Sequence, residues 1–212
     1  MIRLRTRAAW RRAVCIATLA CASIPALFAE EPPVDTAVDD RRAFVESMGR
    51  VSKMIELGDM KEATRILGEV IAAHPGEVEP QLMMGSLLIT SGQYDEASRL
   101  MDDLLLHHPR DARLLNNYAW MLCTAGDPSF RDPARALELA RDAILISPDD
   151  YHVWSTLAEA HYAAGNFAQA VKVLNECLAL AARKNAGEQK VHTYRMQMQK
   201  MQEALSVMSL IE

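Results

Sequence analysis

A spacing of 34 residues recurs along this chain and constrains its fold more than any other feature. Short polar breaks separate apolar segments, and each break holds one glycine: Gly58, Gly92, Gly126 and Gly165. A proline stands 17 residues before each of the last three glycines, and an alanine stands 12 residues before each proline (Pro75, Pro109, Pro148; Ala63, Ala97, Ala136). One interval is longer, because five extra residues lie within 127–133. Such a period predicts a repeat architecture with units of supersecondary size.

Each unit has the pattern of two helices. Apolar residues recur at spacings of three and four, as at Leu82, Met83 and Leu87, without the alternation of a strand. Glycine permits a positive φ in the turn, and proline prevents continuation of the second helix. One helix pair cannot bury its apolar face alone, so the pairs should stack into an all-α solenoid over residues 41–182. We expect units at about 44–77, 78–111, 112–150 with the five-residue insertion, and 151–184.

The units resemble the tetratricopeptide repeat (TPR) of proteins that bacteria export. The fourth unit is the best match, with Trp154, Leu157, Ala158, Gly165, Phe167, Ala170 and Leu174 at the family's positions. The second unit offers Gly85, Leu88, Tyr94 and Ala97, and the third offers Tyr118, Ala119 and Ala136. The first departs from the pattern, with Ser47, Arg50 and Val51 at the family's Trp, Leu and Gly sites. The resemblance covers about residues 44–182 and implies a right-handed α-solenoid of about four helix-turn-helix units.

The first 29 residues have the parts of a signal peptide. Five arginines precede an apolar run from Ala13 to Ala29, and Glu30 begins a polar stretch. We expect cleavage after Ala29, with a second candidate site after Ala22, and a periplasmic or secreted protein. Retention of the segment as an anchor, or lipidation of Cys21, would instead bring the chain to a membrane. Residues 30–40 have the composition of a flexible linker.

A second apolar pattern follows the repeats. Six residues fall on one helical face at spacings of three and four: Val191, Tyr194, Met198, Met201, Leu205 and Met208. We expect residues 187–208 to form a helix that caps the last repeat. The alternative is a methionine-rich docking surface for a partner.

Charge and motif content argue against several functions. All five charged residues before Glu30 are arginines, which leaves 18 of 23 basic and all 28 acidic residues afterwards, a net charge of −10. An acidic body argues against nucleic-acid binding. Phosphate-binding loops, zinc-binding motifs and nucleophile motifs are missing from the sequence, so we expect no catalysis, cofactor or metal. Cys123 and Cys177 could form one bridge in an oxidising compartment, but both lie in helical stretches, which favours free thiols.

The resemblance implies a partner-binding groove, because the first helices of TPR units line a concave surface that holds peptides or partner segments. Matching the motif places nine residues there: Met83, Ser86, Arg113, Asn117, Trp120, His152, Thr156, Glu159 and Tyr162. Asn117 is expected to hydrogen-bond a partner's backbone, with tying of adjacent repeats as the alternative role. Trp120 could equally pack inside the protein. We therefore expect a protein-protein interaction module in an envelope or secretion assembly; the alternative is a carrier or enzyme that uses the groove as a pocket.

Overall fold

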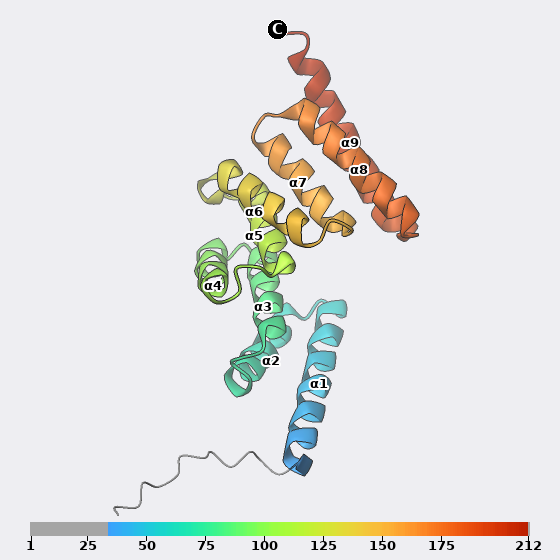
Figure 1. Ribbon diagram of the computed structural model, residues 1–212. Helices are drawn as coiled ribbons and strands as arrows, with labels where there is room; N and C mark the ends of the chain where they lie inside the picture. Colours follow the sequence, from blue (N-terminus) through green and yellow to red (C-terminus); the bar gives the residue numbers. More distant parts are fainter. Residues whose placement is uncertain (1–33, 212) are drawn as a thin grey trace, which may run out of the picture.

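The computed structural model describes residues 34–211, which are helical over most of their length. In this part of the chain nine α-helices follow one another without a strand (Figure 1): α1 (Val34–Glu56), α2 (Met60–Ala73), α3 (Val78–Thr90), α4 (Tyr94–His107), α5 (Ala112–Thr124), α6 (Pro133–Ile146), α7 (Tyr151–Ala163), α8 (Phe167–Arg183) and α9 (Glu188–Met208). Successive helices form antiparallel pairs, and the pairs stack from α1 at one end to α9 at the other. The all-α solenoid expected from the repeat is confirmed.

Local chemistry fixes where the helices begin and end. Aspartates at 59, 111, 132 and 150 each accept a hydrogen bond from a backbone N–H in the first turn of the helix that follows. Three of the repeat glycines adopt the left-handed conformation, with φ of 77° at Gly58, 74° at Gly92 and 77° at Gly165. Glycine enters this region without the penalty that a Cβ would bring, so each short turn can reverse the chain.

Gly126 departs from this pattern, because its φ is not positive. The insertion follows it directly and forms a short 3₁₀ turn, η1 (Pro128–Phe130), so the chain need not reverse at the glycine itself. The Gly126 N–H donates a hydrogen bond of 2.8 Å to the hydroxyl of Tyr94 on the preceding repeat. Pro133 then begins α6, where its missing N–H costs nothing.

The repeated alanines are buried between the helices. Ala63, Ala97, Ala136 and Ala170 occupy the same position in the second helix of each pair, and all four are fully buried. Apolar side chains from neighbouring repeats surround them in three successive clusters along the solenoid rather than in one central core. Each repeat therefore depends on its neighbours for burial.

The amino-terminal end of the described chain differs from the sequence-based expectation. A flexible linker was predicted for residues 30–40, but helix α1 begins at Val34, so the prediction is wrong for residues 34–40; residues 30–33 lie outside the described residues. The first half of α1 is held by contacts with the α2–α3 turn, where Arg41 pairs with Glu77 and Phe44 packs edge-on against His74. The predicted signal peptide, residues 1–29, lies outside the described residues.

At the other end, α9 packs against α8, and its buried side chains are Tyr194, Met198 and Met201. Within residues 34–211, no helix combines the length and the apolar character needed to cross a bilayer.

Candidate partner-binding groove

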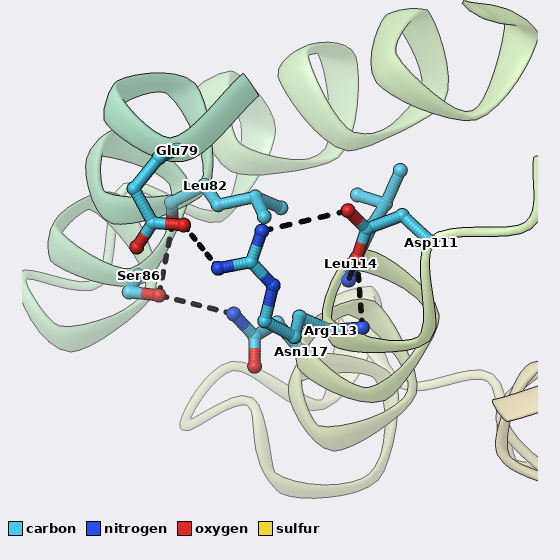
Figure 2. Close-up of polar contacts among 7 residues, drawn as sticks. All are labelled: Glu79, Leu82, Ser86, Asp111, Arg113, Leu114 and Asn117. Carbon is cyan, nitrogen blue, oxygen red and sulfur yellow. Dashed lines mark hydrogen bonds and ion pairs between the residues drawn. The ribbon is translucent and has the colours of Figure 1, made fainter. Parts of the chain in front are cut away.

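Helix α5 holds the centre of the predicted groove. Its N-cap residue Asp111 accepts hydrogen bonds from the backbone N–H groups of Arg113 (2.9 Å) and Leu114 (3.1 Å), which fixes the first turn (Figure 2). Arg113, Asn117 and Trp120 follow at spacings of four and three, so they share one face of the helix. We call this face, together with the matching faces of α3 and α7, the groove face.

Polar side chains on the groove face connect α3 to α5. The Arg113 guanidinium pairs with the carboxylate of Glu79 on α3 and lies 3.6 Å from that of Asp111. Asn117 Nδ2 donates a 3.3 Å hydrogen bond to the Ser86 hydroxyl (Figure 2). Burial acts to lower the pKa of Arg113, but hydrogen bonding and attraction to the two carboxylates outweigh it and raise the pKa overall. The guanidinium therefore remains a fixed cation at the centre of the groove face.

An apolar pocket of about 370 Å³ opens beside these polar groups. Its apolar lining comes from α1, α2 and α3 (Ile55, Met60, Leu82, Met83 and Leu87), and its polar lining comes from Glu79, Ser86, Thr90, Arg113 and Asn117. An apolar cavity with a few convergent polar groups is the usual form of a binding site. Its volume suits one or two large apolar side chains.

A second pocket, of about 380 Å³, lies on the other side of Arg113 and Asn117. It reaches α7 and is lined also by Ala112, Asn116, Ser147, Asp150, His152 and Val153. Within the described residues the Oδ1 atom of Asn116 is buried and accepts no hydrogen bond. Arg113 and Asn117 thus form a polar ridge between two pockets.

Trp120 lies one turn beyond Asn117 and is 36% exposed. Its side chain is therefore neither free in solvent nor enclosed in the core. A half-exposed indole beside a polar ridge offers apolar area and an N–H donor to a ligand.

The groove face of α7 is largely covered by α9. Thr156 and Glu159 are only 3% and 5% exposed. The Lys200 ammonium on α9 lies 2.6 Å from the Glu159 carboxylate and 4.1 Å from the centre of the Tyr162 ring. His152 keeps an exposed edge but bonds to the Tyr194 hydroxyl on α9 at 2.9 Å. The cause is the placement of α9, which presents side chains to α7 much as a further repeat would.

Several residues of these pockets carried no signal in the sequence. Ile55 and Met60 flank the turn at Gly58. The repeat predicts where this turn lies, but it does not predict that the side chains on either side of it line a pocket. Lys200 lies among polar residues of α9, and the apolar periodicity of that helix says nothing about which polar side chain meets α7.

The possible metal ligands and the cysteines of the described chain form neither a metal-binding cluster nor a disulfide. Among residues 34–211, no three His, Cys, Asp or Glu side chains gather as a metal site would require. Both cysteines in this range are buried thiols without a disulfide. Burial, with smaller effects from nearby carboxylates, raises the pKa of Cys123 and of Cys177 to about 12, so neither forms a thiolate at neutral pH.

Comparison with protein families agrees with this architecture. The family model described as tetratricopeptide repeat matches residues 54–120 and 129–186, more than half of the 212 residues. The chain belongs to the tetratricopeptide repeat family. The break between the two matched ranges covers residues 121–128, from the last turn of α5 to the start of the insertion. The resemblance found in the sequence is confirmed. Proteins of this family are in general binding scaffolds for other proteins.

Solved structures share the fold of this TPR protein at low sequence identity. PilF of Pseudomonas aeruginosa has a TM-score of 0.62 at 16% identity, over 77% of this chain and 69% of its own. MamA (residues 41 to the end) of Desulfovibrio magneticus RS-1 has a TM-score of 0.54 at 15% identity, over 76% and 96% of the two chains. A TPR protein of Thermus thermophilus has a TM-score of 0.59 at 16% identity, over 77% and 87%. Such identities show the fold alone. No curated protein matches the chain.

Proposed function

We propose that this TPR protein is a non-catalytic interaction module that binds an extended segment of a partner protein across α3 and α5. The observation that supports this most directly is the apolar pocket of about 370 Å³ beside Arg113 and Asn117. A partner's apolar side chain would enter the pocket, where Met60 and Met83 can adapt to its shape because methionine is flexible. The partner's backbone would then cross the polar ridge.

Asn117 can hold that backbone through its carboxamide. The group has one acceptor and two donor positions, which match the C=O and N–H of a peptide unit. Its hydrogen bonds within the protein are long, 3.3 Å to Ser86 and 3.4 Å from Asn116, so a ligand can compete for them. Arg113 would meet a carbonyl or carboxylate of the partner beside its pairing with Glu79.

We further propose that the protein works outside the cytoplasm, in a cell-envelope or secretion assembly. The support is the amino-terminal sequence alone, in which five arginines precede an apolar run that ends at Ala29. Mass spectrometry of the native protein tests this, and we expect an amino terminus near Glu30. Intact Met1 on a cytoplasmic species would contradict export, and an acylated Cys21 would identify a lipoprotein.

Site-specific photo-cross-linking in the native cells tests the groove. A cross-linking amino acid in place of Met83 lines the apolar pocket, whereas one in place of Leu106 lies on the exposed side of α4. We expect a discrete partner adduct from position 83 and none from position 106. Adducts from position 106 alone would place binding on the second helices and refute the proposed site.

The partner found in this way allows a quantitative test. Removal of a hydrogen bond in a desolvated interface costs about 1–3 kcal/mol, so Asn117→Ala should weaken binding roughly tenfold or more. Asn175→Ala, on the exposed side of α8, is the matched control and should leave affinity unchanged. If Asn117→Ala lowers the melting temperature in step with affinity, Asn117 ties the repeats together instead. Unchanged affinity in Asn117→Ala and Arg113→Ala would refute the role of the ridge.

A further inference from the structure

Methionines gather at the amino-terminal end of the solenoid. Of the 12 methionines in the chain, five lie on α1, α2 and α3: Met48, Met54, Met60, Met83 and Met84. Four of them pack against the core cluster that these three helices share, and Met60 lines the apolar pocket beside it. All five keep some exposure to solvent, whereas Met101, Met121 and Met201 are fully buried. This end of the chain therefore presents thioether sulfurs to small molecules in solution.

Two of these methionines line the apolar pocket of about 370 Å³. Met60 begins α2 and is 38% exposed. Met83 lies on α3, three residues before Ser86, and is half-buried. Because both side chains line an open pocket, a small oxidant reaches them without any unfolding of the repeats.

Polar groups beside the two thioethers can hold an oxidised sulfur. Ser86, Thr90, Arg113 and Asn117 line the same pocket. The hydrogen bond from Asn117 Nδ2 to the Ser86 hydroxyl is long, at 3.3 Å, so this donor can turn to a better acceptor. A thioether sulfur is a weak acceptor, whereas the oxygen of a sulfoxide is strongly polar. An oxidised methionine in this pocket would therefore find hydrogen-bond donors within the protein.

Peroxides carry out this oxidation in one step. The methionine sulfur attacks one oxygen of hydrogen peroxide, the O–O bond breaks, and an S–O bond forms. The leaving hydroxide takes the proton from the new S–OH group and becomes water. The sulfur has then lost two electrons to the peroxide, and a flexible apolar side chain has become a polar sulfoxide.

We propose that Met60 and Met83 are sites of reversible oxidation by peroxides, and that sulfoxides at these positions lower the affinity of the pocket for apolar ligands. A polar group would stand in the apolar lining, and its oxygen would occupy the donors of Asn117 and Arg113 that a ligand otherwise uses. A thiol-dependent methionine sulfoxide reductase restores the thioether. The inference rests on the proposed function, because the oxidised pocket is the one that takes the partner's apolar side chain.

The chain offers matched variants for a test. Leucine and methionine have similar volumes, so Met60→Leu and Met83→Leu remove the sulfurs and keep the lining apolar. Met196 on α9 is 53% exposed and is not among the pocket residues. Met196→Leu therefore removes an accessible sulfur without any change to the pocket.

Nuclear magnetic resonance of the whole protein, labelled at the methionine methyl groups, follows each methionine separately. Anilinonaphthalene sulfonate is the ligand probe, because its rings suit the apolar lining and its sulfonate suits Arg113. We expect the dye to shift the signals of Met60 and Met83 but not that of Met196. Hydrogen peroxide should convert Met60 and Met83 to sulfoxides well before Met101 and Met121. After this conversion we expect the dye to bind at least tenfold more weakly, as measured by fluorescence titration.

Each variant is compared with its own untreated form. In the double variant Met60→Leu, Met83→Leu, peroxide should change dye affinity less than twofold. Met196→Leu should lose affinity on oxidation as the parent does, and methionine sulfoxide reductase should restore dye binding to the oxidised parent.

The proposal fails if the oxidised parent keeps its affinity, or if the double variant loses as much affinity as the parent. It also fails if circular dichroism shows that the oxidised parent has lost helix, since unfolding would then explain the weaker binding. A dye that binds but leaves the signals of Met60 and Met83 unchanged would instead refute the pocket as a ligand site, and with it both the proposed function and this inference.

Discussion

Replacement of Ala97 by leucine tests the register of the repeats. Ala97 is fully buried on α4, in the same cluster as Leu82 and Met101. The contact between α3 and α4 is tight, since a Cβ on Gly85 would lie 2.3 Å from Met101 Cε. Three added carbons would each contribute about 0.8 kcal/mol if they were buried without strain. In a close-packed contact strain prevails, and we expect Ala97→Leu to lower the free energy of unfolding by about 1–3 kcal/mol.

Urea denaturation followed by far-ultraviolet circular dichroism measures this change. For a chain of this size, each kcal/mol corresponds to about 2–4 °C in melting temperature, so thermal unfolding gives a second readout. Ala179→Leu is the matched control, because Ala179 lies on α8 with its side chain exposed, and surface changes stay within about 0.5 kcal/mol. If Ala97→Leu and the parent share one denaturation midpoint, α4 does not pack as described and the reasoning is refuted.

Three further predictions follow from conformation, charge and burial. Gly92→Ala should destabilise the protein by about 1 kcal/mol because its φ is 74°, whereas Gly68→Ala, in α2 with open space around it, should stabilise it by about 0.5–1 kcal/mol in the same urea titration. Burial lowers the pKa of His152 and of His161 below 6.5, so the unfolded chain binds more protons than the folded chain as the pH falls through that value. The melting temperature should therefore decrease between pH 7 and 5.5, and replacing both histidines by glutamine should make that decrease smaller. The two buried thiols should resist iodoacetamide at pH 8 and react once urea unfolds the chain; rapid labelling of the folded protein would contradict their placement.

The sequence determined the repeat and most of the fold. Period, turn glycines and closing prolines are local signals, because a left-handed turn or a missing N–H restricts the backbone wherever it occurs. Ala97 and the alanines at the same position in the other repeats are fully buried, as the recurrence of a small residue at that position predicts. Where local signals were ambiguous the expectation was wrong, as at residues 34–40, whose acidic side chains resembled a linker although α1 begins at Val34.

The tertiary structure alone decided which part of the groove face is open. The repeat motif places Asn117 and Thr156 at equivalent positions on first helices, yet Asn117 lines a pocket and Thr156 is only 3% exposed. The difference comes from α9, whose Lys200 meets Glu159 from 41 residues away in the sequence. The periodicity of a sequence predicts which face of a helix is apolar. A polar contact between helices far apart in the sequence depends on how those helices are placed relative to each other, and no local sequence pattern predicts this placement.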